Sequence, residues 1–137
     1  MTICVGIIGR NFVVDWLLAA MEQVPELRPA AIYSRSAETG RAFAEKYHLD
    51  AAYTDLEAFA AADTFDAAYI ASPNRCHFEQ ALCLLRHGKH VLLEKPGAPP
   101  ALMLAAVPVQ YAHRKGIWFT GLAADRSIPA DKLLPKL

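Results

Sequence analysis

Short apolar segments alternate with segments of helical period along this chain, and this alternation constrains the fold more than any other feature. Several of the apolar segments are apolar throughout, which is typical of parallel strands that helices cover on both faces. The predicted strands are residues 3–9, 30–34, 51–53, 67–72, 90–95 and 116–122. Helices between parallel strands indicate an α/β protein, a single domain with a doubly wound parallel sheet of about six strands.

The first two helices are predicted from apolar spacing and from one capping residue. Ser36 is a natural N-cap for a helix that runs to about residue 48. In the segment that follows Asn11, one stripe at helical spacing is predicted to face the core. Its members are Val13, Leu17, Ala20, Met21 and Val24.

Two later helices are predicted from their end signals. The sequence TDLE predicts a capping box in which Thr54 caps the amide of Glu57. Gly88 is expected to end a helix over residues 74–87 in the left-handed conformation. The buried face predicted for that helix is Phe78, Ala81, Leu82 and Leu85.

Composition and charge exclude several classes of function. The 137 residues carry no net charge at pH 7, so nothing favours nucleic acid or anionic lipid as a partner. No apolar run approaches the roughly 18 residues of a membrane span. The N-terminus has neither a basic start nor a small-residue cleavage site, so a cytoplasmic chain is expected. Three cysteines without regular spacing indicate reduced thiols.

The sequence VGIIGRNFVVDW, residues 5–16, has the form of a strand that turns directly into a helix. The dinucleotide-binding fingerprint G-x-G-x-x-G/A has three glycine positions, and in this chain they are occupied by Gly9, Asn11 and Val14. Asn tolerates positive φ better than other residues with a side chain, so Asn11 is expected to be tolerated, whereas Val14 should push helix and strand slightly apart. Arg10 adds a cation beside the expected phosphates. This loop alone leaves nucleotide binding and a purely structural turn equally open.

The end of the second predicted strand, IYSRS, bears on the choice of cofactor. An Asp or Glu there would bind the 2′-hydroxyl of NAD, and neither is present. Ser34 and Arg35 instead offer a hydroxyl and a guanidinium, which suit the 2′-phosphate of NADP. The alternative is a solvated arginine in a turn.

Four motifs occur in order at the spacing of a known family: GIIGRNF, YSRS, ASPNRCH and EKP. Over residues 3–96, and more loosely to its end, the chain resembles the N-terminal domain of the glucose–fructose oxidoreductase/inositol dehydrogenase/MocA family (Gfo/Idh/MocA). The resemblance implies a Rossmann fold that binds NADP, with NAD as an alternative. It further implies an NAD(P)-binding domain at residues 1–122. Residues 123–137 would begin the connection to a second, substrate-binding domain.

The resemblance also implies which residues bind the cofactor. They would be Gly9, Arg10, Asn11, Phe12 and Val13 at the pyrophosphate, Ser34 and Arg35 at the adenosine ribose and its phosphate, Ser72, Pro73, Asn74 and His77 along the groove, and Glu94 and Lys95 near the nicotinamide. Lys95 is the implied catalytic residue, because a cation can polarise an oxygen that gains negative charge as hydride moves.

The implied reaction is hydride transfer between a nicotinamide and a sugar-like or cyclitol alcohol. In the family a second domain supplies most substrate contacts, and it would begin near Leu137, where this sequence stops. We therefore expect the cofactor-binding half of an oxidoreductase, which takes a small polyol or sugar-like substrate once a second domain is supplied. The alternative is a nucleotide-binding module or remnant without turnover. A homo-oligomer stays open, since family members associate mainly through the second domain.

One predicted helix carries several candidate metal ligands. One face there carries Cys76, Gln80, Cys83 and His87. Ligands that all lie on one helix rarely complete a tetrahedron, and no fourth ligand is evident. No metal site is therefore predicted, and we expect a semi-exposed amphipathic face instead.

Overall fold

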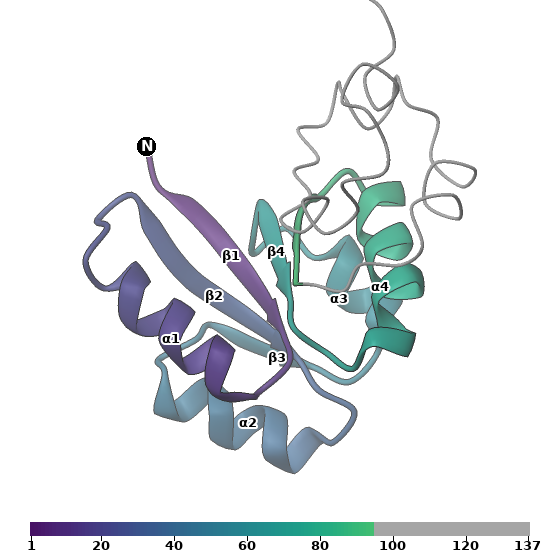
Figure 1. Ribbon diagram of the computed structural model, residues 1–137, viewed down its shortest axis with the longest axis horizontal. Coiled ribbons are helices and arrows are strands. Elements are labelled where there is room, and N and C mark those ends of the chain that lie inside the picture. The colour runs from purple at the N-terminus through teal and green to yellow at the C-terminus, as the bar shows by residue number, and fades with distance from the viewer. Residues whose placement is uncertain (95–137) are drawn as a thin grey trace, which may run out of the picture.

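The computed structural model describes residues 1–94, which form one parallel sheet with helices on both of its faces (Figure 1). The strands are β1 (Ile3–Ile8), β2 (Leu27–Tyr33), β3 (Ala51–Tyr53), β4 (Ala67–Ile70) and β5 (His90–Leu93). Their order in the sheet is β3-β2-β1-β4-β5, and every neighbouring pair is parallel. This topology confirms the predicted doubly wound α/β fold. The strand predicted at 116–122 lies outside the described residues.

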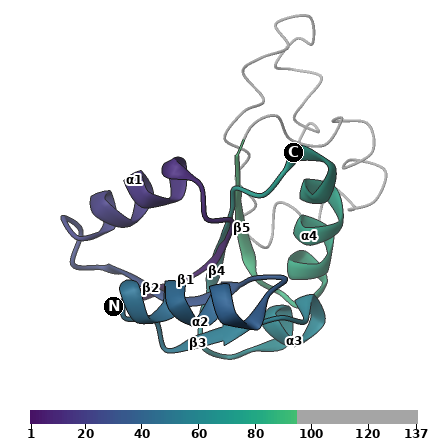
Figure 2. The same cartoon turned by 90° about the horizontal axis from the view of Figure 1, so that it is seen from below.

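Four helices connect the strands: α1 (Phe12–Met21), α2 (Ala37–Lys46), α3 (Leu56–Ala61) and α4 (Asn74–Arg86). Figures 1 and 2 show α1 and α4 on opposite faces of the sheet. Two core clusters match these faces: one packs α1 and α2 on the sheet, and the other packs α3 and α4. Within residues 1–94, no helix is both long and apolar enough to cross a bilayer.

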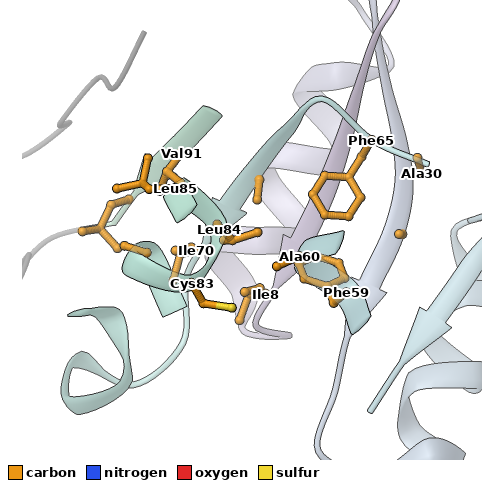
Figure 3. Packing of buried hydrophobic residues seen from close by; sticks show 14 residues of the cluster. Ile8, Ala30, Phe59, Ala60, Phe65, Ile70, Cys83, Leu84, Leu85 and Val91 are labelled. Carbon is orange, nitrogen blue, oxygen red and sulfur yellow. The ribbon is translucent and has the colours of Figure 1, made fainter. Parts of the chain in front are cut away.

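The core under α3 depends on a close approach between β1 and two aromatic rings. Phe59 and Phe65 lie beside each other in Figure 3, with ring centroids 4.5 Å apart. A Cβ at Gly6 would stand 2.8 Å from the Phe59 ring and 2.9 Å from the Phe65 ring. Glycine at this position of β1 therefore makes room for the aromatic core.

The buried face of α1 differs from the prediction. Met21 is buried as predicted, and Val14 and Leu18 are buried beside it. Val13 and Leu17 are half-buried against the same core, whereas Ala20 and Val24 are exposed. Two adjacent stripes of this helix are apolar, because Val13 precedes Val14 and Leu17 precedes Leu18. Helical period alone therefore could not distinguish the two faces.

The N-cap of α3 and the first residue of β2 also differ from the predictions. Asp55, not Thr54, caps α3, and its Oδ1 accepts a hydrogen bond from the Ala58 amide at 2.7 Å. β2 begins three residues earlier than predicted and includes Pro29, a residue that usually argues against a strand interior. The sheet accommodates Pro29 at a register shift, where one extra residue of β2 lies opposite the step from Val5 to Gly6.

The buried face of α4 is wider and more polar than predicted. Phe78 and Leu82 are only half-buried at the margin of the core. The residues that are buried are His77, Gln80, Ala81, Cys83, Leu84 and Leu85. The semi-exposed face expected around Gln80 and Cys83 is therefore wrong. Gly88 follows the helix with φ +77°, as predicted.

Candidate functional site

The strand order places a topological switch point between β1 and β4. From β1 the chain proceeds outward through β2 to β3, and it then returns to form β4 and β5 on the other side of β1. In open α/β sheets, ligands bind at the carboxyl ends of the strands at such a point. The predicted cofactor-binding residues up to position 94 follow the carboxyl ends of β1, β2, β4 and β5. The fold therefore brings them to one edge of the sheet.

Gly9 meets two demands at the end of β1. Its φ of +114° is a conformation that residues with a side chain rarely adopt. A Cβ at this position would also stand 2.6 Å from the carbonyl oxygen of Ala71 and 3.2 Å from the amide nitrogen of Ser72. The backbones of the β1–α1 and β4–α4 loops thus touch at Gly9, and only glycine allows that contact.

Asn11 occupies the second glycine slot as the N-cap of α1. Its Oδ1 accepts hydrogen bonds from the amides of Val13, at 3.1 Å, and Val14, at 3.3 Å. Its Nδ2 donates to the carbonyl oxygen of Ala71 at 2.9 Å. The φ of Asn11 is −83°, an extended conformation, so Asn11 does not use the positive φ that was expected of it. Asparagine fits here because it caps the helix and bonds to the neighbouring loop.

The N-terminus of α1 retains unused donors. Within residues 1–94, no acceptor is present for the amides of Arg10, Asn11 and Phe12. These amides lie at the positive end of the helix dipole, where anions bind readily. Val14, in the third fingerprint slot, is fully buried between α1 and the sheet. Its effect on the helix–strand separation stays a prediction.

The turn after β2 holds the two residues that are predicted to bind the adenosine ribose and its phosphate, and the structure gives them different roles. Ser34 is buried, and its hydroxyl hydrogen-bonds to Thr39 Oγ1 at 3.0 Å and accepts from the Ser36 amide at 3.4 Å. Arg35 is exposed. Ser34 therefore shapes the turn, whereas Arg35 presents its guanidinium to solvent. The side chain of Ser36 caps α2 as predicted.

An open depression of about 290 Å³ lies between α1 and α2, next to this turn. Its lining is Arg10, Asp15, Thr39, Ala42, Phe43 and Lys46. Asp15 accepts a hydrogen bond from the Tyr47 hydroxyl, and its Oδ1 lies 4.0 Å from Lys46 Nζ. Asp15 thereby connects the two helices that form the walls of the depression.

Two buried polar residues of α4 form hydrogen bonds to the β4–α4 loop. Nε2 of His77 donates to the carbonyl oxygen of Ser72 at 2.7 Å. Ser72 Oγ donates to Gln80 Oε1. His77 is only 1% exposed, whereas Pro73 and Asn74 of the same loop and helix start are exposed. His77 and Gln80 thus position this loop, a role that sequence analysis missed for Gln80 because apolar spacing gives no signal for a buried amide.

Glu94 follows β5 and is fixed by β4. Its amide donates to the carbonyl oxygen of Ile70 at 2.9 Å, and its Oε1 accepts from the Tyr69 hydroxyl at 2.5 Å. Burial, and then this hydrogen bond, raise the pKa of Tyr69 well above its usual range. The role of Tyr69 has no signal in the sequence, because a tyrosine is an ordinary residue of a β-strand. The predicted catalytic Lys95 lies outside the described residues.

Comparisons with known proteins agree with this geometry. A family described as "Oxidoreductase family, NAD-binding Rossmann fold" matches residues 3–119. The scyllo-inositol 2-dehydrogenase (NADP(+)) of Bacillus subtilis is 49% identical over 93 residues, which is 68% of this chain and 28% of that protein. The chain therefore spans little more than a quarter of the length of this relative.

Solved structures share the fold of this chain. A 3-ketoreductase from Actinomadura kijaniata, in complex with TDP-benzene and NADP, matches with a TM-score of 0.75 and 29% identity over 89% of this chain and 37% of that one. The scyllo-inositol dehydrogenase of Lactobacillus casei shares the fold, with a TM-score of 0.72 and 21% identity over 86% of this chain and 35% of that one. This chain therefore belongs to the Gfo/Idh/MocA oxidoreductases, and it carries their NAD-binding Rossmann domain.

Proposed function

We propose that this domain binds NADP(H) across the carboxyl edge of its sheet, as the cofactor-binding half of an oxidoreductase. The proposed reaction is hydride transfer between the nicotinamide and a sugar-like or cyclitol alcohol. One observation carries the proposal: the start of α1, with its unused amides, is held against the β4–α4 loop by Gly9 and Asn11. That arrangement is a preformed site for a pyrophosphate.

The pyrophosphate would lie on the loop Gly9–Val13. The amides of Arg10, Asn11 and Phe12 supply donors that need no rearrangement, because Asn11 already fixes the first turn of α1. The exposed guanidinium of Arg10 adds positive charge beside the same loop.

The preference for NADP rests on the turn after β2. This turn has no carboxylate to bind a ribose 2′-hydroxyl, and its Arg35 is exposed. A guanidinium binds a phosphate with charge-assisted hydrogen bonds. Ser34 supports Arg35 by fixing the turn through Thr39. The NADP(+) in the name of the Bacillus subtilis relative agrees with this preference.

The nicotinamide end would lie near Ser72–Asn74 and Glu94. The cofactor, when bound, gives or takes the hydride, and the chain's own residues orient it there. The hydrogen bonds of His77 and Gln80 fix Ser72, and Tyr69 fixes Glu94. We propose Lys95 as the catalytic residue, whose charge would stabilise the oxygen that becomes negative as hydride moves.

The substrate class and domain organisation belong to the same proposal. Residues 1–122 would form the cofactor domain, and residues 123–137 would lead into a substrate domain. Support for a polyol or sugar substrate comes from the relative's name, scyllo-inositol 2-dehydrogenase. A cytoplasmic location is part of the proposal, because Cys4, Cys76 and Cys83 are all unpaired and cytosolic proteins keep thiols reduced.

The location of the site can be tested by following backbone amide resonances of the ¹⁵N-labelled chain as NADPH is added. We expect the largest shifts at residues 9–13, 34–36, 72 and 74, with little change in the hollow that Arg41, His48 and Leu49 help to line. Shifts that centre on this hollow, or no shifts in a folded chain, would contradict the proposed site.

A further inference from the structure

The packing of α3 against α4 brings three metal-binding side chains together. A carboxylate oxygen of Glu57, the sulfur of Cys83 and a ring nitrogen of His87 all lie within 4.8 Å of one another. In the sequence, the candidate metal ligands all lie on one helix. The fold adds Glu57 from a second helix, and it leaves Cys76 outside the group. The three candidate ligands therefore come from two helices, which can surround a cation more completely than one helix can.

The ring of His87 is oriented by the backbone of α4. Its Nδ1 lies 2.9 Å from the carbonyl oxygen of Cys83. A carbonyl can only accept, so Nδ1 carries the proton and the neutral ring keeps its lone pair on Nε2. Nε2 lies 3.4 Å from Glu57 Oε2. Histidines that bind metals commonly donate their other N–H to a carbonyl in this way.

The three donors match the chemistry of one class of cation. Cys83 lies in the last turns of α4, and His87, four residues later, is the C-cap of that helix on the same face. Glu57 lies in the first turn of α3. A sulfur, an imidazole nitrogen and a carboxylate oxygen are ligands that Zn²⁺ prefers. Ligands of a tetrahedral Zn²⁺ lie roughly 3.3–3.8 Å apart. The Glu57 side chain, which is 73% exposed, is free to make the small closing movement.

We propose that Glu57, Cys83 and His87 form a binding site for a thiophilic divalent cation of the Zn²⁺ class. Binding forms a metal–sulfur bond and releases the thiol proton of Cys83 to solvent, and a water completes the fourth position. The site lies at the C-terminal end of α4, whereas the proposed cofactor site lies at its N-terminal end. The cation would therefore connect α3 to α4 and stabilise the fold without a part in hydride transfer.

Two simpler interpretations make different predictions. Cys83 could be a reactive thiol, but burial, with a smaller effect of the Glu57 side chain, raises its pKa to about 11. A protonated, buried thiol is a poor nucleophile. Glu57 and His87 could instead form only an ion pair across α3 and α4. In that case Cys83 binds no cation, and an added cation would form no bond to the Cys83 sulfur.

Cobalt(II) is the probe of choice, because its bond to a thiolate gives a charge-transfer absorption in the near ultraviolet. We expect the tag-free, reduced 137-residue chain to bind one Co²⁺ with this absorption and to lose it on addition of Zn²⁺. Cys83→Ser should abolish the absorption, and Glu57→Gln should weaken Co²⁺ binding at least about tenfold. Cys76→Ser is the matched control on the same helix and should leave the absorption unchanged.

Because Cys83 is buried, its replacement could unfold the chain, so a second measurement uses His87→Gln at an exposed position. Zn²⁺ should raise the melting temperature of the wild-type chain and of Cys76→Ser, but not that of His87→Gln, since a ligand that binds only the folded state stabilises it. The proposal is overturned if the folded wild-type chain gives no cobalt–thiolate absorption. It is equally overturned if the absorption depends on Cys76, or if Zn²⁺ stabilises His87→Gln as much as the wild type.

Discussion

Asn11 connects the start of α1 to the end of β4, because its Nδ2 donates to the carbonyl oxygen of Ala71 at 2.9 Å. The same side chain caps α1 through the amides of Val13 and Val14. A glycine in this slot would do neither. In this chain, therefore, a side chain aligns the two loops between which the cofactor is proposed to bind.

Replacing Asn11 by Ala should lower the free energy of unfolding by about 2 kcal/mol, because both the helix cap and the hydrogen bond to Ala71 are lost. Urea denaturation measures this change. Asn11→Asp keeps the cap and loses only the donor, so its loss should be smaller. Equal stability of Asn11→Ala and the wild type would show that the connection contributes nothing.

Replacing Gly9 by Ala should destabilise the chain by about 1–3 kcal/mol, because alanine is strained at a φ of +114° and its Cβ would collide with the Ala71 carbonyl. The shifted loop should also bind NADPH more weakly. Chemical denaturation and fluorescence titration of NADPH test the two effects. Unchanged values for both would refute the account of the loop contact.

Arg35→Ala should weaken NADPH binding by about 10- to 100-fold and leave NADH binding nearly unchanged, because charge-assisted bonds to the 2′-phosphate contribute about 1.5–3 kcal/mol. Arg41→Ala is the matched control, an exposed arginine whose Nε bonds to the Ala37 carbonyl oxygen of its own helix. Equal losses for both cofactors, or equal losses in both variants, would argue against a phosphate-specific role of Arg35.

The cap of α3 offers a direct comparison of two neighbouring residues. Asp55→Ala should cost about 1 kcal/mol of stability, because the carboxylate that accepts from the Ala58 amide is removed. Thr54→Ala should change stability little, since its hydroxyl does not cap the helix. Thermal unfolding of the two variants distinguishes them. The reverse ranking would restore the capping box expected from the sequence.

Tyr69 makes stability sensitive to alkaline pH. Its pKa is raised in the folded chain, so the unfolded state loses the phenol proton first, from about pH 10 upward. The contribution of the Tyr69 phenol to the free energy of unfolding is complete below about pH 10 and is lost as the pH rises above it. Tyr69→Phe should therefore lose less stability than the wild type between neutral and alkaline pH in urea denaturation. If the free energies of unfolding of the wild type and of Tyr69→Phe fell equally with rising pH, Tyr69 would not be the source of the alkaline sensitivity.

The sheet was predictable because several of its strands are apolar throughout, which distinguishes them from the amphipathic segments between them. Which helix face is buried was less predictable. The α1 helix is apolar on adjacent stripes, and α4 buries His77 and Gln80, whose polar ends are satisfied by Ser72. The residues proposed for the cofactor site could be placed from motifs, because the ends of parallel strands meet at one edge.

The contacts that hold the site together were not predictable from the sequence. The bond of Asn11 to Ala71 and the meeting of Glu57 with Cys83 both join residues far apart in the chain. They depend on how loops and helices pack across the sheet, and local sequence patterns carry no information about such contacts.

Calorimetric titration of the 137-residue chain with NADPH and, separately, with NADH tests the central claim most directly. The account predicts that NADPH binds at least about tenfold more tightly than NADH, because Arg35 can bond to the 2′-phosphate. Tighter binding of NADH, or no heat with either cofactor from a chain that circular dichroism shows to be folded, would contradict it.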